Sequence, residues 1–502
     1  MTKPAFAAAL LVTFLTGCGF TVTTRTVPPS DALPAIAPST PAVKKNPAAQ
    51  LAALATQAGD DPAALQTAAE FALVVGDKLR NRDPQAAVGF FSSALELGLR
   101  AAEADPDPRA HDDTINAATL QLVTLADRPQ DPRRTVDTPL GPRTIDVTSA
   151  FTNDPTQPAF DQLVPSELIS VTGFTYRVTI PGFGVPLVGV HESSTIPFYE
   201  RRGTFTPVTA VPRLARRVEA ADLTIELLDP RHQQTVETPT GTATLAADFT
   251  TPIALVFDRL NDLALGIRGL LFVGDQMKLA GLYMLEPYDP DRIPVLMVHG
   301  LSSSPLIWRN LINELQIDPV IRENYQFWVI YYPSGVSTIA SAAYLRDQLA
   351  AIRQTFDPAG DDLASRDLIT FGHSMGGVIT RMNAVEIEDR LWETISDRPF
   401  EDAPLDPEDR ETLATRLFWE PLPQLHRAVY FSAPHRGATL ADGSLATFGM
   451  RLIRLPADTL AFQTRLVKTL GSFLVLDFDI SELTNSIGSL SPRNPVFTAV
   501  DN

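Results

Sequence analysis

A single serine lies within a glycine-rich turn in the C-terminal half of the chain. The segment from Gly372 to Gly376 reads "GHSMG" and fits the pattern G-x-S-x-G. The apolar run before it predicts a strand, and residues 376–395 predict a helix. Such a turn would lift the Ser374 hydroxyl out of the sheet edge, and the positive end of the helix would favour negative charge there. The pattern predicts a nucleophilic serine; a purely structural turn is the alternative.

A second glycine-containing turn is expected to supply part of the same site. The stretch "VHGL", ending at Leu301, follows an apolar run that begins at Ile293, so it would end a buried strand. Where a nucleophilic serine lies in a strand-to-helix turn of this kind, the backbone N–H of the residue after the serine and an N–H from such a loop bind the oxyanion. We therefore predict that the backbone N–H groups of Leu301 and Met375 form the oxyanion hole. Each such donor typically contributes about 2.7–4 kcal/mol of transition-state stabilisation.

Strands and helices alternate along the chain from Ile293 onward, and they would position these turns. Apolar runs at 325–333, 367–374 and 425–435 predict buried strands, and residues 338–356 have the apolar spacing of a helix. Near-continuous apolar strands joined by helices are typical of a parallel sheet covered on both faces. We therefore predict an α/β fold with a mostly parallel sheet.

Three short stretches, "VHGLSSSP", "GHSMGG" and "FSAPHRGA", together resemble the α/β-hydrolase family, and within it the lipases and esterases. The resemblance covers about Gly281 to the C-terminus, somewhat less than half of the chain. It implies a Ser–His–Asp triad, an acyl-enzyme at Ser374 and an ester-containing substrate, of which lipid is one class. It also implies that the site uses neither a metal nor an organic cofactor.

The acid and the histidine of that triad are not found where the resemblance places them. In the family, both follow the nucleophile, on loops after later strands. Only His426 and His435 follow Ser374. His426 would lie at the sheet end opposite the serine, and His435 at the correct end but one strand too early. We expect the chain to stop before the strands that carry the acid and the histidine. Two explanations would fit: the sequence is truncated, or the protein is a degenerate hydrolase.

Other residues near the predicted site have expected structural roles. His299 and His373 neighbour the two turns and are expected to pack and to hydrogen-bond. Residues 447–478 form an apolar helical stretch, which predicts either a lid over the serine or an ordinary buried helix.

The N-terminus predicts a lipid-anchored protein of the bacterial cell envelope. Lys3 precedes an apolar run of 11 residues, Ala5 to Leu15, too short to span a bilayer and typical of a secretory signal peptide. The run ends in "LTGC", which resembles a bacterial lipobox, so we predict that Cys18 is lipidated and anchors the chain in the membrane. A stray cysteine in a plain signal peptide is the alternative. Because the next residue is Gly19 and not aspartate, we favour the outer membrane, on its periplasmic or surface side.

Composition divides the remainder of the chain into segments. Residues 1–18 form the signal peptide, and residues 19–49, rich in Pro, Thr and Ala, predict an extended tether. Residues 50–134 predict helices, with a start at Asp83-Pro84 and a stop at Asp105. A helical bundle is preferred there over tetratricopeptide repeats, because too few units would fit. Residues 135–280 predict a β-rich segment, and residues 281–502 the hydrolase domain, incomplete at its C-terminus.

Charge and cysteine content exclude several classes of protein. The net charge of −18, without any long basic stretch, argues against nucleic acid as a partner. Cys18 is the only cysteine, so an internal disulfide and a CxxC metal site are excluded.

Three functions fit the pattern. The first is a membrane-anchored serine hydrolase of carboxylic esters that acts through Ser374. The second is a catalytically degenerate lipoprotein that serves as a binding scaffold, whose helical segment binds an unidentified protein. The third is an acyltransferase that uses the same acyl-enzyme.

Overall fold

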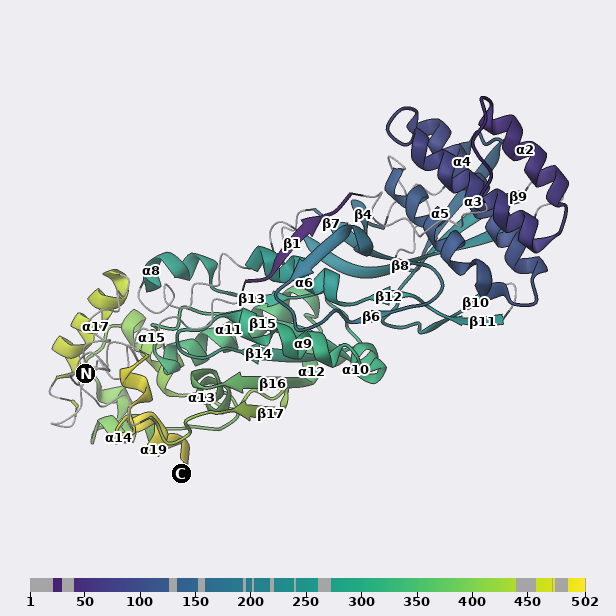
Figure 1. The fold of residues 1–502 in the computed structure, drawn as a ribbon. Coiled ribbons are helices and arrows are strands. Elements are labelled where there is room, and N and C mark those ends of the chain that lie inside the picture. Colours follow the sequence, from purple (N-terminus) through teal and green to yellow (C-terminus); the bar gives the residue numbers. More distant parts are fainter. Residues whose placement is uncertain are drawn as a thin grey trace, which may run out of the picture.

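The computed structural model describes most of the chain, and the molecule is elongated. Figure 1 shows a group of helices at one end, a five-stranded sheet at the other, and strands of a six-stranded sheet reaching between them. Residues 1–20, which include Cys18 and the expected signal peptide, lie outside the described residues. The described residues are 21–28, 40–125, 133–151, 159–192, 196–200, 203–216, 221–238, 241–260, 272–438, 457–471, 473–474 and 486–501.

Four helices form the first group: α2 (Pro47–Ala58), α3 (Pro62–Leu79), α4 (Pro84–Ala104) and α5 (Asp112–Leu125). The first three begin in the same way. A side-chain oxygen of Asn46, Asp61 or Asp83 accepts a hydrogen bond from the backbone N–H three residues later, and a proline occupies the start of the helix. The expected helix start at Asp83 is confirmed, and α4 ends at Ala104, directly before the expected stop.

The six-stranded sheet shares one apolar core with these helices. Its order is β2-β3-β9-β8-β7-β4, and of its pairings only β3 with β9 is parallel. Phe71 and Phe91 from the helices belong to the same buried cluster as Leu187, Val208 and Ile225 from the strands. The strands are β2 (Arg133–Val136), β3 (Arg143–Ser149), β4 (Gln162–Pro165), β7 (Val185–His191), β8 (Thr204–Arg216) and β9 (Ala221–Leu228).

Shorter elements surround the six-stranded sheet. Three antiparallel pairs join β1 with β5, β6 with β12, and β10 with β11. These elements are β1 (Thr23–Thr26), β5 (Ile169–Thr172), β6 (Thr179–Ile180), β10 (Thr235–Thr238), β11 (Gly241–Thr244), β12 (Ala247–Asp248), the helices α6 (Thr250–Leu260) and α8 (Val273–Gln276), and the short helical turns η2 (Pro108–His111), η3 (Ser166–Leu168) and η5 (Met277–Leu279).

The five-stranded sheet has the order β13-β15-β14-β16-β17 and combines both pairing types. The edge strand β13 is antiparallel to β15, and the other three pairings are parallel. The strands are β13 (Gly281–Met284), β14 (Ile293–Val298), β15 (Tyr325–Tyr331), β16 (Leu368–His373) and β17 (Leu425–Phe431). The helices of this part are η6 (Pro305–Trp308), α9 (Arg309–Leu315), α10 (Pro319–Asn324), α11 (Thr338–Phe356), α12 (Leu363–Arg366), α13 (Met375–Met382), α14 (Arg390–Ile395), η7 (Phe400–Asp402), α15 (Pro407–Leu417), α17 (Ala457–Leu470), η9 (Gly488–Leu490) and α19 (Pro495–Asp501).

Helices cover both faces of this sheet, because its central strands send alternate side chains to two separate cores. Leu296 and Val298 of β14 pack with α11 and α13 on one face. Val295 and Met297 pack on the other face with α6, α9 and Phe205 of β8. The part of the chain before β13 therefore supplies some of the cover on one face of the sheet, together with α9.

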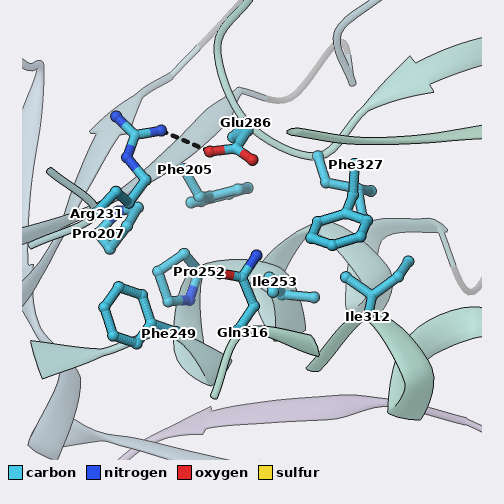
Figure 2. Close-up of a pocket in the computed structure, with 11 residues that line it drawn as sticks. Phe205, Pro207, Arg231, Phe249, Pro252, Ile253, Glu286, Ile312, Gln316 and Phe327 are labelled. Atoms are coloured by element: carbon cyan, nitrogen blue, oxygen red, sulfur yellow. Dashed lines mark hydrogen bonds and ion pairs between the residues drawn. The ribbon is translucent and has the colours of Figure 1, made fainter. Parts of the chain in front are cut away.

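A buried ion cluster also joins the two parts. Arg231, in the turn after β9, and Arg292, just before β14, both contact the carboxylate of Glu286, with N–O distances of 2.6 Å and 2.7 Å. Burial alone would raise the pKa of Glu286, but the two guanidiniums outweigh it and hold this pKa below its ordinary value. Figure 2 shows Arg231 and Glu286 beside a cavity of about 20 Å³ lined mainly by apolar side chains. That volume holds one water molecule, so the cavity is no substrate site.

The observed fold combines helices with sheets that contain both parallel and antiparallel strand pairs, whereas an α/β fold with a mostly parallel sheet was expected. The expected single helix 376–395 is wrong: α13 ends at Met382 and α14 begins at Arg390. Asn383 explains the break, because its backbone carbonyl accepts a hydrogen bond from the Leu422 N–H. Among the described helices, none is both long and apolar enough to cross a membrane.

Candidate active site

Ser374 lies between β16 and α13, two elements that Figure 1 shows next to each other, and its backbone has a conformation that few residues adopt. Its φ is 53° and its ψ is −122°, a strained region for a residue with a Cβ. The Ser374 N–H donates to the Phe431 carbonyl at 2.9 Å, and the Gly377 N–H donates to the Ser374 carbonyl at 2.9 Å. We call residues Gly372–Gly377 the serine elbow. The strand-to-helix turn expected from the sequence is confirmed.

Three glycines allow other backbone segments to approach the serine elbow closely. A Cβ on Gly376 would lie 2.2 Å from the Val298 carbonyl oxygen. A Cβ on Gly372 would lie 2.6 Å from the Gly377 Cα, and one on Gly377 would lie 2.3 Å from the Ala433 Cβ. Since Cβ atoms essentially never come within 3.0 Å of such neighbours, the elbow has room for glycine alone at these positions.

The loop His299–Ser302, which we call the oxyanion loop, follows β14 and borders the serine elbow. A Cβ on Gly300 would lie 2.9 Å from the Ser374 Cβ, so the two turns are in contact. Within the part of the chain that the structure describes, neither the Leu301 N–H nor the Met375 N–H has a protein acceptor. Met375 is the residue after Ser374, and Leu301 is the residue after Gly300. A developing oxyanion needs N–H donors of this kind, and these two residues directly follow the contacting pair Gly300 and Ser374.

The side chain of His299, the first residue of the oxyanion loop, is fully buried. Its Nδ1–H donates to the Gly300 carbonyl at 2.9 Å, and its ring stacks on Tyr332 with centroids 4.3 Å apart. Burial lowers the pKa of His299 to about 4, so the ring is neutral at neutral pH. The structural role expected for His299 is confirmed by these contacts.

The other histidines of this region lie at both ends of the sheet. The parallel register pairs Leu368 with Leu425, which places His426 at the amino end of the strands, with its Nδ1 against the Asp367 carboxylate. His435 follows the carboxyl end of β17, and its ring lies edge-on to Tyr430, 4.6 Å between centroids. The expected placement of both histidines is therefore confirmed. No hydrogen bond joins Ser374 to a histidine among the described residues.

His373 lies in the serine elbow itself and is half-buried. Burial lowers its pKa below the ordinary value. Its Nδ1 is buried and has no hydrogen-bond partner within the described ranges. The edge of its ring faces Trp308, with centroids 6.4 Å apart. Packing is therefore the main contact of this ring.

Tyr332 and Ser334 contact the oxyanion loop, and the sequence reasoning missed both. The Tyr332 hydroxyl donates to the His299 carbonyl, and the Ser302 N–H donates to the Ser334 Oγ at 3.0 Å. A signal was present, because Tyr332 lies at the end of the strand predicted at 325–333 and Ser334 directly follows that strand. The carboxyl ends of neighbouring parallel strands meet at one sheet edge.

The segment 486–494 runs along the carboxyl edge of the sheet. The Ser486 N–H donates to the carbonyl of Gly335, which lies in the loop after β15. The N–H of Ala438, which lies in the loop after β17, donates to the Leu490 carbonyl. This segment therefore joins the loops on both sides of β14 and β16. Of the expected lid 447–478, the structure describes 457–471 and 473–474.

Helix α17, within that expected lid, is attached to α15. Arg465 forms an ion pair with Asp409 at 2.7 Å, and Phe462 lies beside the guanidinium of Arg416, 5.3 Å from its ring centroid. Leu466 and Leu470 are buried, whereas Leu460 and Val467 are about half exposed, at 49% and 53%. These contacts attach α17 to the helical layer, and Leu466 and Leu470 belong to the same apolar cluster as Met375.

No group of three His, Cys, Asp or Glu side chains with the geometry of a metal site occurs among the described residues.

Comparison with known proteins found no matching family model and no matching curated protein. Among solved structures, the lipase BlEst2 of Bacillus licheniformis matches in its propeptide form, with 19% identity and a TM-score of 0.22 over 42% of this chain and 32% of that chain. Its mature form matches with 19% identity and a TM-score of 0.20 over 38% of this chain and 64% of that chain. The chain thus spans less than two thirds of either form, and likenesses this weak carry no argument about activity.

Proposed function

We propose that this protein is a serine hydrolase of the α/β-hydrolase type that acts on carboxylic esters. One observation carries the proposal: Ser374 has a strained φ of 53° at the carboxyl end of a parallel strand, directly before a helix. A serine in ordinary surface loops has no need of such strain, whereas strain of this kind gathers at functional sites. The contact with Gly300 supports the same conclusion.

The reaction would proceed through an acyl-enzyme. The Ser374 oxygen bonds to the ester carbonyl carbon, and the carbonyl electron pair moves onto the oxygen, which the Leu301 and Met375 N–H groups bind. The electron pair on the oxyanion then re-forms the C=O bond as the ester C–O bond breaks, and the alcohol leaves with the proton given up by the Ser374 hydroxyl. Water adds to the acyl group and releases the carboxylic acid, which frees the serine again. An alcohol in place of water would give acyl transfer.

The proton of the Ser374 hydroxyl needs a base, and of the two histidines that follow Ser374 in the chain, His435 is the one at the carboxyl edge of the sheet. The Ala433 Cβ contacts Gly377, which brings the loop that carries His435 against the serine elbow. The matched control is His426, which lies at the opposite end of the strands. Hydrolysis that is lost in His435→Ala and kept in His426→Ala would assign the base to His435; equal loss or equal retention would remove it.

The test of the whole proposal is covalent labelling of the full chain with a fluorophosphonate, followed by intact mass measurement, and hydrolysis of a short p-nitrophenyl ester. We expect one label on the wild type and none on Ser374→Ala. Without a general base, the oxyanion hole and binding alone leave about 10³–10⁴-fold catalysis over water. If His435 is not the base, we therefore expect weak ester hydrolysis by this chain. Persistent labelling of Ser374→Ala would remove Ser374 from the mechanism.

A binding scaffold is the second candidate function. It is favoured by the lack, among the described residues, of a histidine hydrogen-bonded to Ser374. A wild-type chain that is folded, is not labelled and does not hydrolyse the ester would support the scaffold over the enzyme.

Lipid anchoring at Cys18 is part of the same proposal, although that residue lies outside the described residues. It rests on the N-terminal apolar run followed by "LTGC". The anchor would hold the chain at the bacterial envelope, with the outer membrane as the preferred location. An ester substrate in or near the membrane would then be within reach.

A further inference from the structure

The peptide bond between Gly300 and Leu301 is held from one side by a buried imidazole. The Nδ1 of His299 lies 2.9 Å from the Gly300 carbonyl oxygen. A carbonyl oxygen only accepts hydrogen bonds, so Nδ1 carries the proton and donates it. The ring is fully buried, so this bond is shielded from bulk solvent.

This hydrogen bond decides the direction in which the Leu301 N–H points. A trans peptide is planar, and its C=O and N–H point in opposite directions. Because the Gly300 carbonyl is held against the buried ring, the Leu301 N–H must point away from the ring. Glycine has little intrinsic preference for one orientation of the following peptide. Without the bond to His299, this peptide would be free to flip and to present its carbonyl in place of its N–H.

The imidazole is itself held in one orientation. The Tyr332 backbone N–H points at its Nε2 across 3.5 Å, and the Tyr332 ring is stacked on it at 8° between planes. The Tyr332 hydroxyl also donates to the His299 carbonyl. Both ring nitrogens therefore face partners, and the tautomer with the proton on Nδ1 is selected. The same contacts explain why His299, although it lies in the oxyanion loop, is not available as a general base.

The far end of the oxyanion loop is fixed independently. The Ser302 N–H donates to the Ser334 Oγ at 3.0 Å, and Ser302 has a φ of 54°. A positive φ is unfavourable for serine, so this hydrogen bond helps to maintain the turn. Gly300, between the two fixed ends, is in contact with Ser374.

We propose that His299 is a positioning residue for oxyanion binding, supported by Tyr332 and Ser334. It holds the Gly300–Leu301 peptide in the one orientation that presents the Leu301 N–H to the oxyanion formed at Ser374. The inference rests on the proposed function, because it assumes acyl transfer at Ser374. It goes further by assigning the loop's orientation to side chains that touch no substrate.

The test compares two replacements of His299 that differ in one donor. His299→Leu fills the buried space without a hydrogen-bond donor. His299→Asn places its amide nitrogen near the position of Nδ1 and keeps the donor to the Gly300 carbonyl. The rates of fluorophosphonate labelling and of p-nitrophenyl ester hydrolysis are measured on the full chain, with kcat and KM determined separately.

We expect His299→Leu to lower kcat and the labelling rate by about 10²-fold with KM little changed, because one oxyanion donor is lost. His299→Asn should recover most of that loss. A merely structural role for His299 would change stability but would not separate the two variants in kcat. Equal kcat in wild type and folded His299→Leu would overturn the inference, whereas the absence of labelling in the wild type would overturn the proposed function itself.

If His299→Leu does not fold, Ser334 decides the matter from the other end of the loop. Ser334→Ala removes the acceptor of the Ser302 N–H, and Ser334→Thr keeps a hydroxyl at the same place. We expect about a tenfold lower kcat in Ser334→Ala and recovery in Ser334→Thr. An unchanged kcat in Ser334→Ala would refute the positioning of the loop by these side chains.

Discussion

Gly376→Ala is the most direct perturbation of the contact between the serine elbow and β14. The new Cβ would lie 2.2 Å from the Val298 carbonyl oxygen and 2.5 Å from the His299 carbonyl oxygen. To reach even 3.0 Å, the shortest separation that such atoms show, the first pair would have to move apart by about 0.8 Å. Both obstacles are backbone atoms, so no side-chain rotation can relieve the clash.

The displacement should affect catalysis more than stability. Overpacking of this kind costs about 1–3 kcal/mol, and a shift of about 1 Å between catalytic groups costs about 10²-fold in rate. We therefore expect Gly376→Ala to remain folded in urea titrations, with a lower midpoint, and to react with a fluorophosphonate about 10²-fold more slowly than wild type. The obstacles lie directly before Gly300, so the clash acts where the serine elbow meets the oxyanion loop.

Gly281→Ala is the matched control, because it lies in β13 of the same sheet. Its Cβ would meet its nearest neighbour, the Tyr283 ring, at 3.5 Å, an ordinary contact. This variant should keep wild-type stability within about 0.5 kcal/mol and the wild-type labelling rate. If Gly376→Ala behaves like Gly281→Ala in both measurements, the close approach of the elbow to β14 is not what holds the site together.

Three further predictions concern stability, pH and anchoring. Glu286→Ala leaves two buried arginines without their shared carboxylate, so it should lower the free energy of unfolding in urea by about 3–5 kcal/mol. The control Glu226→Ala, from an ion pair about one third exposed, should lower it by under about 1 kcal/mol. Similar losses in the two variants would contradict this prediction. Burial lowers the pKa of His299 from 6.5 to about 4, so the unfolded chain binds this proton first as the pH falls. The unfolding free energy should then drop by roughly 3 kcal/mol between pH 6.5 and 4, a component that His299→Asn should lack. Cys18→Ser should abolish partitioning into a detergent phase, and wild-type protein that stays in the aqueous phase would refute the anchor.

Some features of the site could be predicted because their causes are local. The glycines of the elbow are required by contacts at the turn itself, and the pattern "GHSMGG" signals them directly. The helix start at Asp83-Pro84 is equally local, because one side chain accepts the third N–H and the proline needs no N–H partner. The alternation of apolar strands with helices after Ile293 follows from periodicity within each element.

The break between α13 and α14 could not be read in the same way. Residues 376–395 have an uninterrupted helical pattern, yet the Asn383 carbonyl bonds the Leu422 N–H and not the next helical turn. Similarly, the support of the oxyanion loop by Tyr332 and Ser334 arises only when β15 is placed beside β14.

The sequence by itself determined the serine elbow, the oxyanion loop and the opposite placements of His426 and His435, because each depends on residues close together in the chain. Tertiary structure alone decided the strand order, with β13 as an antiparallel edge, and the cover of one sheet face by α6 and Phe205 from the preceding part. It also decided which side chains orient the Gly300–Leu301 peptide. These features depend on contacts between residues far apart in sequence, and the pairing of distant apolar surfaces leaves no local signal that periodicity or steric rules could detect.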